Sequence, residues 1–161
     1  MRITKEVEFD YGHRVPSHKS KCRNLHGHRG KVQATLEGDI KTIRGESDDG
    51  MVIDFSDIKL ALTSICDNLD HAFIVYDKDF PVVGFLQSMP DHKTIYTNFI
   101  PTAENLSQWV FNSLHFMIDA VYQGDLTLVN VRFYETPTSF CDATSYQDGF
   151  KSSHVYPVVP V

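Results

Sequence analysis

The chain has 161 residues, of which 42% are hydrophobic and 22% are charged, and its formal net charge is −6. This length and composition suit a single domain over residues 1–161 and exclude a wholly disordered chain. Three cysteines are too few for a disulfide scaffold, and no apolar run reaches about 18 residues, so we expect a cytoplasmic protein without a membrane span or signal peptide. The acidic balance also disfavours nucleic acid as a partner.

The periodicity of apolar residues predicts four strands and two helices. Alternation indicates strands, and spacing of three and four residues indicates helices, the first of which begins at the N-cap Asp54. The predicted strands cover residues 3–11, 26–39, 126–133 and 140–146, and the predicted helices cover 54–69 and 101–124.

This order of elements favours an α+β fold in which a four-stranded antiparallel sheet carries two helices on one face. Such a sheet has two exposed edges, so we expect a homo-oligomer that pairs them. Residues 77–100 show no sustained period and are predicted to be a long loop or insertion. The tail over 148–161 is apolar and interrupted by prolines, which suits either packing on a neighbouring subunit or fraying.

Charge is distributed unevenly along the chain. Between Tyr11 and Leu36 there is no acidic residue, but there are six basic ones: Arg14, Lys19, Lys21, Arg23, Arg29 and Lys31. A local basic segment in an acidic chain suits a small anionic ligand, although charge alone does not separate this from an ordinary solvated face.

The same segment holds the strongest chemical signal. His26 and His28 lie two residues apart on a predicted strand, so their side chains project from the same face, and Gly27 leaves room between them. His13, at the end of the preceding strand, supplies a third imidazole if the strands pair, and His18 is a rival in the following loop. Three histidines with one open position are typical of a catalytic zinc, whereas an isolated pair is more often plain surface.

Other residues carry weaker signals. Cys22 is either a fourth zinc ligand or a thiolate favoured by nearby cations, and its spacing leaves both roles open. Asp70-His71 suits a proton shuttle, and Glu135 can accept two N–H bonds from a flat heterocycle. Glu104, taken alone, most simply stabilises the first turn of a helix. The remaining cysteines are expected to pack in the core or a strand: Cys66 and Cys141.

Several blocks of the sequence, in order over residues 3–147, resemble the 6-pyruvoyltetrahydropterin synthase and 6-carboxytetrahydropterin synthase family. The short gap between the cysteine and the His-Gly-His unit is similar to that of the 6-carboxytetrahydropterin synthases of queuosine and other 7-deazapurine pathways. The blocks that carry the resemblance are Gly12-His13-Arg14-Val15-Pro16, Cys22-x-x-x-His26-Gly27-His28, Met51 to Lys59, Leu69-Asp70-His71, Pro101 to Leu106, and Glu135-Thr136.

This resemblance implies a tunnelling fold (T-fold), in which sheets from several subunits close a barrel, commonly in a homohexamer built as a dimer of trimers. It implies zinc as cofactor and 7,8-dihydroneopterin triphosphate as substrate, with 6-carboxytetrahydropterin, acetaldehyde and triphosphate as products. A pyruvoyl product without carbon–carbon cleavage, and a non-catalytic pterin- or metal-binding protein, are the alternatives.

The resemblance also assigns roles to residues. Cys22 would accept a proton as a thiolate, and His71, oriented by Asp70, would relay protons from a neighbouring subunit. The implied zinc ligands are His13, His26 and His28; the implied catalytic residues are Cys22, Asp70, His71 and Glu135; and the implied substrate-binding residues are Glu135, Thr136 and Glu104.

The sequence departs from the family pattern in one place near these ligands. An aromatic or other large apolar residue often lies two positions after the second histidine of His-Gly-His, whereas Gly30 stands there in this chain. We expect this change to alter the pocket wall.

Overall fold

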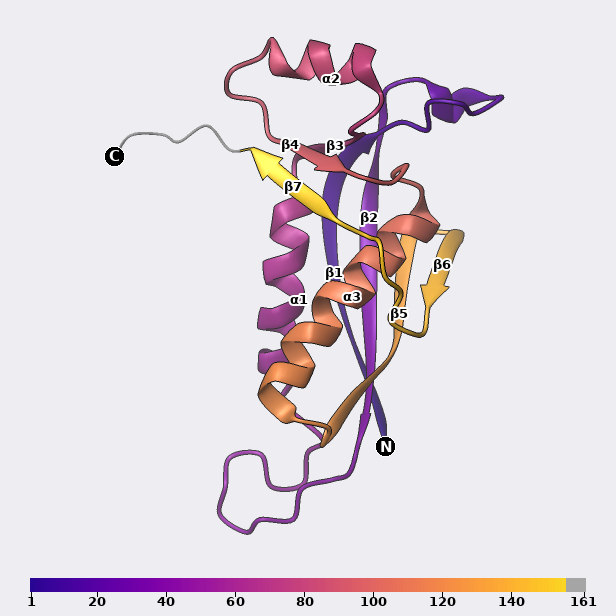
Figure 1. Ribbon diagram of the computed structural model, residues 1–161. Coiled ribbons are helices and arrows are strands. Elements are labelled where there is room, and N and C mark those ends of the chain that lie inside the picture. The colour runs from indigo at the N-terminus through magenta and orange to yellow at the C-terminus, as the bar shows by residue number, and fades with distance from the viewer. Residues whose placement is uncertain (156–161) are drawn as a thin grey trace.

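One mixed, curled sheet organises residues 1–155, the part of the chain that the computed structural model describes (Figure 1). Its strands lie in the order β6-β5-β2-β1-β3-β4-β7. The strands are β1 (Arg2–His13), β2 (His26–Gly38), β3 (Ala72–Tyr76), β4 (Thr94–Thr97), β5 (Leu126–Thr136), β6 (Ser139–Ala143) and β7 (Ser152–Val155), and the α-helices are α1 (Phe55–Leu69), α2 (Phe80–Gln87) and α3 (Ala103–Tyr122).

The α+β class is confirmed, but the predicted four-stranded antiparallel sheet is wrong in extent and in direction. The four predicted strands correspond to β1, β2, β5 and β6, which are antiparallel to one another. The sheet continues on the other side of β1, where β3 pairs parallel to β1 and β4 pairs parallel to β3. These added strands have four and five residues, too few for an alternating pattern to be recognised.

Two predicted irregular segments contain regular structure. The predicted loop over 77–100 holds α2 and β4, because the apolar run from Phe80 packs Val82 and Leu86 against Val75 of β3. The predicted tail from Asp148 holds β7, which pairs antiparallel with β4. The end of that tail, residues 156–161, lies outside the described residues.

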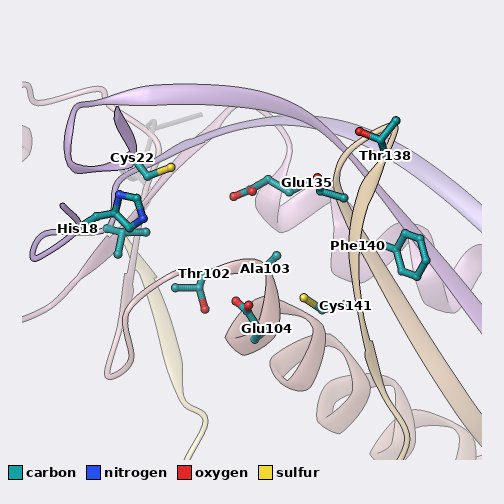
Figure 2. A pocket seen from close by; sticks show the side chains of 11 residues that line it. His18, Cys22, Thr102, Ala103, Glu104, Glu135, Thr138, Phe140 and Cys141 are labelled. Atoms are coloured by element: carbon teal, nitrogen blue, oxygen red, sulfur yellow. The ribbon is translucent and has the colours of Figure 1, made fainter. Parts of the chain in front are cut away.

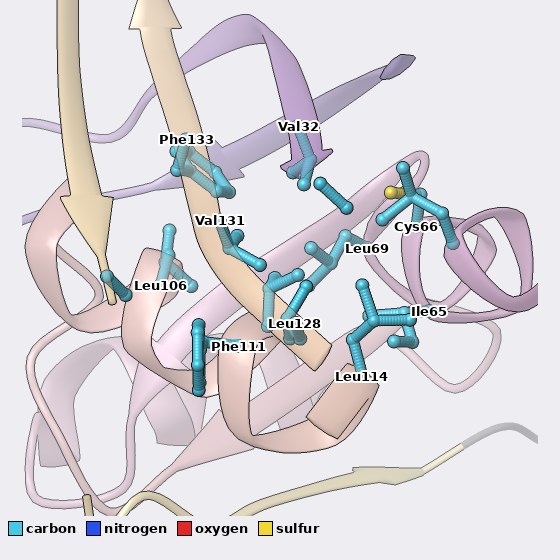
Figure 3. Packing of buried hydrophobic residues seen from close by; sticks show 14 of the residues in the cluster. Val32, Ile65, Cys66, Leu69, Leu106, Phe111, Leu114, Leu128, Val131 and Phe133 are labelled. Atoms are coloured by element: carbon cyan, nitrogen blue, oxygen red, sulfur yellow. The ribbon is translucent and has the colours of Figure 1, made fainter. Parts of the chain in front are cut away.

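The two predicted helices are confirmed, and they cover one face of the sheet. The Asp54 carboxylate caps α1 by accepting a hydrogen bond from the Ser56 N–H, and the Thr102 hydroxyl caps α3. Burial of apolar side chains between helices and sheet drives this packing (Figure 3). The core includes Val32, Val131 and Phe133 of the sheet and Leu62, Cys66, Leu106 and Leu114 of the helices. None of the described helices is long and apolar enough to cross a membrane.

Candidate metal centre and active site

The pairing of β1 with β2 brings three imidazoles together. His13 lies directly opposite His26, and Tyr11 lies opposite His28, so the three histidines project from one face. Their ring centroids are 4.6 to 5.2 Å apart, and one ligand nitrogen from each lies within 4.8 Å of the others. We call His13, His26 and His28 the histidine trio.

Hydrogen bonds orient two members of the trio. His13 Nδ1 lies 2.6 Å from the carbonyl oxygen of Pro101, and His26 Nδ1 lies 2.8 Å from that of Asn24. A carbonyl can only accept, so each Nδ1 carries the proton and each Nε2 keeps a lone pair. This is the arrangement that orients histidines as metal ligands.

Two members of the trio are also suited to a metal by their protonation. Burial lowers the pKa of His13 to about 4 and holds the pKa of His28 below its usual value. The Nε2 atoms of both residues are buried without a hydrogen-bond partner. Buried polar atoms are rarely left unsatisfied, and neutral imidazoles are the form that binds metals. The trio therefore fits a divalent metal ion.

Two glycines adapt the strands to this cluster. A Cβ on Gly27 would lie 2.8 Å from the backbone oxygen of Tyr11, so only glycine lets β2 approach β1 between the two histidines. A Cβ on Gly30 would meet the rings of Phe9 and Tyr11 at 3.0 Å. Gly30 is buried against these rings and does not line the cavity. The absence of a large apolar residue at this position therefore changes the packing of Phe9 and Tyr11 and not the wall of the cavity.

A cavity of about 600 Å³ lies beside the trio. Glu135 links the two, because its Oε1 lies 3.4 Å from His13 Nε2 and 3.6 Å from His28 Nε2. Cys22 and Glu135 point toward the same space from opposite walls, with Glu104 at the start of α3 below them (Figure 2). The lining comprises Val15, His18, Cys22, Thr102, Ala103, Glu104, Glu135, Thr138, Ser139, Phe140 and Cys141.

Some of these lining residues were not expected. Cys141, for which we predicted only packing, packs against the core from β6 and also reaches the cavity. Burial and the neighbouring Glu104, which accepts its hydrogen bond, raise the pKa of this thiol. A hairpin prediction at Thr136-Pro137-Thr138 would have found Cys141, since β6 folds back along β5 there. His18 also lines the cavity, but it lies outside the trio.

The predicted substrate-binding residues fall in two cavities. Glu104 lines the large cavity, whereas Thr136 lines a second one of about 310 Å³ together with His28, Arg29 and Lys31. Glu135 borders both cavities. Glu104 and Thr136 therefore line different cavities, and Glu135 is the predicted substrate-binding residue that lines both.

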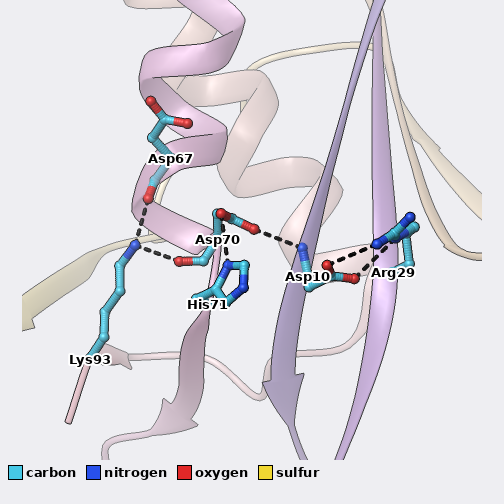
Figure 4. Close-up of polar contacts among 6 residues, drawn as sticks. All are labelled: Asp10, Arg29, Asp67, Asp70, His71 and Lys93. Carbon is cyan, nitrogen blue, oxygen red and sulfur yellow. Dashed lines mark hydrogen bonds and ion pairs between the residues drawn. The ribbon is translucent and has the colours of Figure 1, made fainter.

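The predicted Asp70–His71 pair forms but lies apart from the large cavity. His71 Nδ1 donates to Asp70 Oδ2 at 2.9 Å, and Asp70 Oδ1 accepts from the Asp10 N–H at 2.9 Å (Figure 4). The Asp10 N–H and His71 hold the pKa of Asp70 below its usual value. The side chain of His71 is 78% exposed, and its backbone has a φ of 56°. Within one chain, His71 does not line the cavity that holds Cys22.

Comparison with known proteins identifies relatives of this chain. Residues 2–145 match the family model described as 6-pyruvoyl tetrahydropterin synthase. The 6-carboxy-5,6,7,8-tetrahydropterin synthase of Haemophilus influenzae is 38% identical over 146 residues, which cover 88% of this chain and 96% of that protein. The enzyme of the same name from Aquifex aeolicus is 30% identical over 157 residues, covering 85% and 93%.

Solved structures agree on the fold. The 6-pyruvoyl tetrahydropterin synthase of Plasmodium falciparum superposes with a TM-score of 0.67 at 20% identity, covering 91% of this chain and 98% of that chain. An uncharacterized protein from Wolinella succinogenes superposes with a TM-score of 0.72 at 26% identity, covering 89% and 97%. The fold is therefore the T-fold, and the chain belongs to the 6-pyruvoyl tetrahydropterin synthase family.

Proposed function

We propose that this chain is a zinc-dependent 6-carboxy-5,6,7,8-tetrahydropterin synthase. The observation that carries the proposal is the position of the histidine trio beside a cavity that the Cys22 thiol and two carboxylates line, with Glu135 bordering both the trio and the cavity. The names of the relatives from Haemophilus influenzae and Aquifex aeolicus favour the carboxy branch. The proposed substrate is 7,8-dihydroneopterin triphosphate, which reacts with water to give 6-carboxytetrahydropterin, acetaldehyde and triphosphate.

His13, His26 and His28 would hold the zinc ion. Three neutral imidazoles with an open fourth position form the donor set of catalytic zinc sites. Zinc bound there would supply Lewis-acid polarisation of the hydroxyl oxygens on the substrate side chain. The surrounding residues would then perform the proton transfers.

Cys22 is the proposed proton acceptor. Its thiol faces the cavity from the basic segment, outside the trio, which supports a role as base and not as fourth ligand. Glu135, which borders the trio, is proposed to accept hydrogen bonds from the amino-pyrimidine edge of the pterin and to join the proton relay. Glu104 offers a second carboxylate to the same ring from the opposite wall.

His71 would act across a subunit boundary in this proposal. Its exposed side chain and its separation from the Cys22 cavity support a role in the cavity of a neighbouring chain. We therefore propose a homohexamer built as a dimer of trimers, in which pairing of the sheet edges closes a barrel. Light scattering coupled to size-exclusion chromatography would measure the mass, and an active monomer would contradict this part of the proposal.

A pyruvoyl synthase is the second candidate function. The matching family model and the Plasmodium falciparum structure both bear that name. It requires loss of triphosphate without carbon–carbon cleavage, so the two candidates differ in whether acetaldehyde is released. A non-catalytic pterin-binding protein is a third reading, to which the Cys22 thiol and the Asp70–His71 pair would be superfluous.

Product analysis tests the proposal directly. Purified, zinc-loaded protein is incubated with 7,8-dihydroneopterin triphosphate, the pterin product is identified by mass, and acetaldehyde is measured by reduction with NADH and alcohol dehydrogenase. We expect acetaldehyde and the carboxy product in equal amounts. A pyruvoyl product without acetaldehyde would establish the second candidate, and unchanged, tightly bound substrate would establish the third. The variant Cys22→Ala should keep its zinc and lose turnover.

A further inference from the structure

Arg14 and Asp79 form a shielded ion pair next to the metal centre. Arg14 Nε and Nη2 each donate to a separate carboxylate oxygen of Asp79 at 2.5 Å. The Asp79 side chain is only 3% exposed, and that of Arg14 is 24% exposed. Burying a carboxylate is costly unless it is paired and hydrogen-bonded, so this geometry is strongly held.

The Asp79 side chain does not cap α2, although its position at the N-terminus of that helix favours capping. Asp79 is the N-cap residue of α2, where an aspartate usually accepts a hydrogen bond from the first turn of the helix. Its side chain makes no such bond, and only its backbone carbonyl accepts, from the N–H groups of Val82 and Val83. The carboxylate is instead committed to Arg14.

Arg14 has a further contact, which leads toward the cysteine. Its Nη1 donates to the carbonyl oxygen of Arg23 at 3.3 Å. Arg23 ends the 3₁₀ turn Lys21–Arg23, of which Cys22 is the middle residue. The Val15 N–H also donates to the Cys22 carbonyl oxygen at 2.8 Å, which closes the base of the same loop. One guanidinium group therefore bridges α2 and the turn that carries the thiol.

The geometry points to Asp79 as a positioning residue for Cys22, acting through Arg14. α2 contributes no residue to the lining of the cavity, and this ion pair connects its N-cap to the turn that carries Cys22. Arg14 is fixed by Asp79 and in turn fixes the loop that directs the Cys22 thiol into the cavity. The inference rests on the proposed function only for its effect on turnover, since the placement of the thiol can be measured without substrate.

Two variants separate the two ends of the bridge. Asp79→Asn removes the charge that holds Arg14, whereas Arg14→Lys keeps a cation for Asp79 but loses the forked donor that also reaches Arg23. Val82→Ala is the matched control, because it loosens the packing of α2 on β3 without touching the ion pair. Alkylation of Cys22 by iodoacetamide, followed by peptide mass spectrometry, reports the exposure of the thiol, and bound zinc is measured in the same samples.

We expect Asp79→Asn and Arg14→Lys to be alkylated at Cys22 several-fold faster than the wild type, with zinc content retained. The kcat should fall about tenfold or more while KM changes little, since a misplaced base slows the chemical step. Val82→Ala should lower the melting temperature and leave the alkylation rate unchanged.

The inference is overturned if both ion-pair variants are alkylated at the wild-type rate. It is also overturned if Val82→Ala accelerates alkylation as much as the ion-pair variants do. Loss of zinc from the ion-pair variants would overturn it too, because it would place the effect at the neighbouring ligand candidate His13. Should Asp79→Asn not fold, Arg14→Lys decides the question. A wild-type protein that forms no pterin product would refute the proposed function, yet the alkylation rates would still test the link.

Discussion

His13 donates a hydrogen bond from Nδ1 to the carbonyl oxygen of Pro101, which lies 88 residues further along the chain, at 2.6 Å. Pro101 precedes Thr102, the N-cap of α3, and Glu104 lies in the first turn of that helix. One contact therefore orients a metal-ligand candidate and fixes the start of the helix that presents Glu104 to the cavity. The two sides of the site are positioned together.

The histidine trio predicts a specific pattern of metal affinity. Replacing His13, His26 or His28 with alanine should weaken zinc binding more than about 100-fold, because even loss of an outer partner of a ligand costs 10- to 100-fold. Competition against a chromophoric chelator measures the affinity. His18→Ala is the control, since His18 lies outside the trio and its Nδ1 accepts a hydrogen bond from the Ser20 N–H. Loss of affinity in the His18 variant would contradict the assignment.

A pair of identical glycine substitutions should have effects of opposite sign. Gly27→Ala places a Cβ 2.8 Å from the Tyr11 backbone oxygen, so β1 and β2 must separate, and we expect a loss of about 2 to 3 kcal/mol in the free energy of unfolding. Gly84→Ala, within α2, meets no atom within 4 Å and should raise that free energy by up to about 1 kcal/mol. Urea denaturation of both variants measures the contrast. Equal effects would show that Gly27 is not sterically required.

The site was predictable where its signals are local. His26 and His28 share a face because strand side chains alternate, and Asp54 and Thr102 cap helices through contacts within a few residues. The contacts that complete the site join distant segments, such as His13 with Pro101, and no periodicity reveals them. The strands β3, β4 and β7 escaped prediction for a related reason, since each is short and depends on its neighbours in the sheet.

The three thiols should differ in reactivity. Burial raises the pKa of Cys66 to about 12, and it is 1% exposed, so iodoacetamide at pH 8 should leave it unmodified in the folded protein. Cys141 should react slowly, because burial and Glu104 raise its pKa. Cys22, on a partly exposed turn among cations, should react first. Peptide mass spectrometry over time measures the order. Faster modification of Cys141 than of Cys22 would argue against Cys22 as the proton acceptor.

Asp70 should contribute stability that depends on pH. The pKa of its carboxyl is lowered in the folded state, so its contribution is present above the ordinary carboxyl pKa and is lost as the pH falls through the folded value. At pH 7, Asp70→Asn should cost about 1 kcal/mol, a modest value because the side chain is 38% exposed and its charge is screened.

The difference between Asp70→Asn and the wild type should shrink below about pH 4, where the unfolded carboxyl protonates. The control Asp67→Asn should change stability by less than about 0.5 kcal/mol, because Lys93 contacts the backbone oxygen of Asp67 and not its carboxylate (Figure 4). Chemical denaturation at a series of pH values measures both variants. A difference for Asp70→Asn that stays constant down to pH 2.5 would contradict the assignment of its lowered pKa.

Tyr11 and Phe9 together occupy the space that a larger residue at position 30 would need, because a Cβ there would also lie 3.0 Å from Cζ of Phe9. A Cβ on Gly30 would lie 3.0 Å from Cε1 of Tyr11, which is 4% exposed. Tyr11→Ala should cost about 3 to 5 kcal/mol through the cavity that it leaves. Gly30→Phe should cost about 1 to 3 kcal/mol, because its ring overpacks the space beside Phe9 and Tyr11. The double variant should be more stable than the sum of the two losses predicts, by about 1 to 3 kcal/mol, since the new ring fills the vacated volume. Urea unfolding of the wild type, the two single variants and the double variant measures this coupling. As a control, the losses of stability from Val82→Ala and Gly30→Phe should simply add, because Val82 and the rings beside Gly30 belong to separate hydrophobic clusters. If the losses from Tyr11→Ala and Gly30→Phe were also additive, a ring on β2 at position 30 would not fill the volume that the Tyr11 ring leaves on β1.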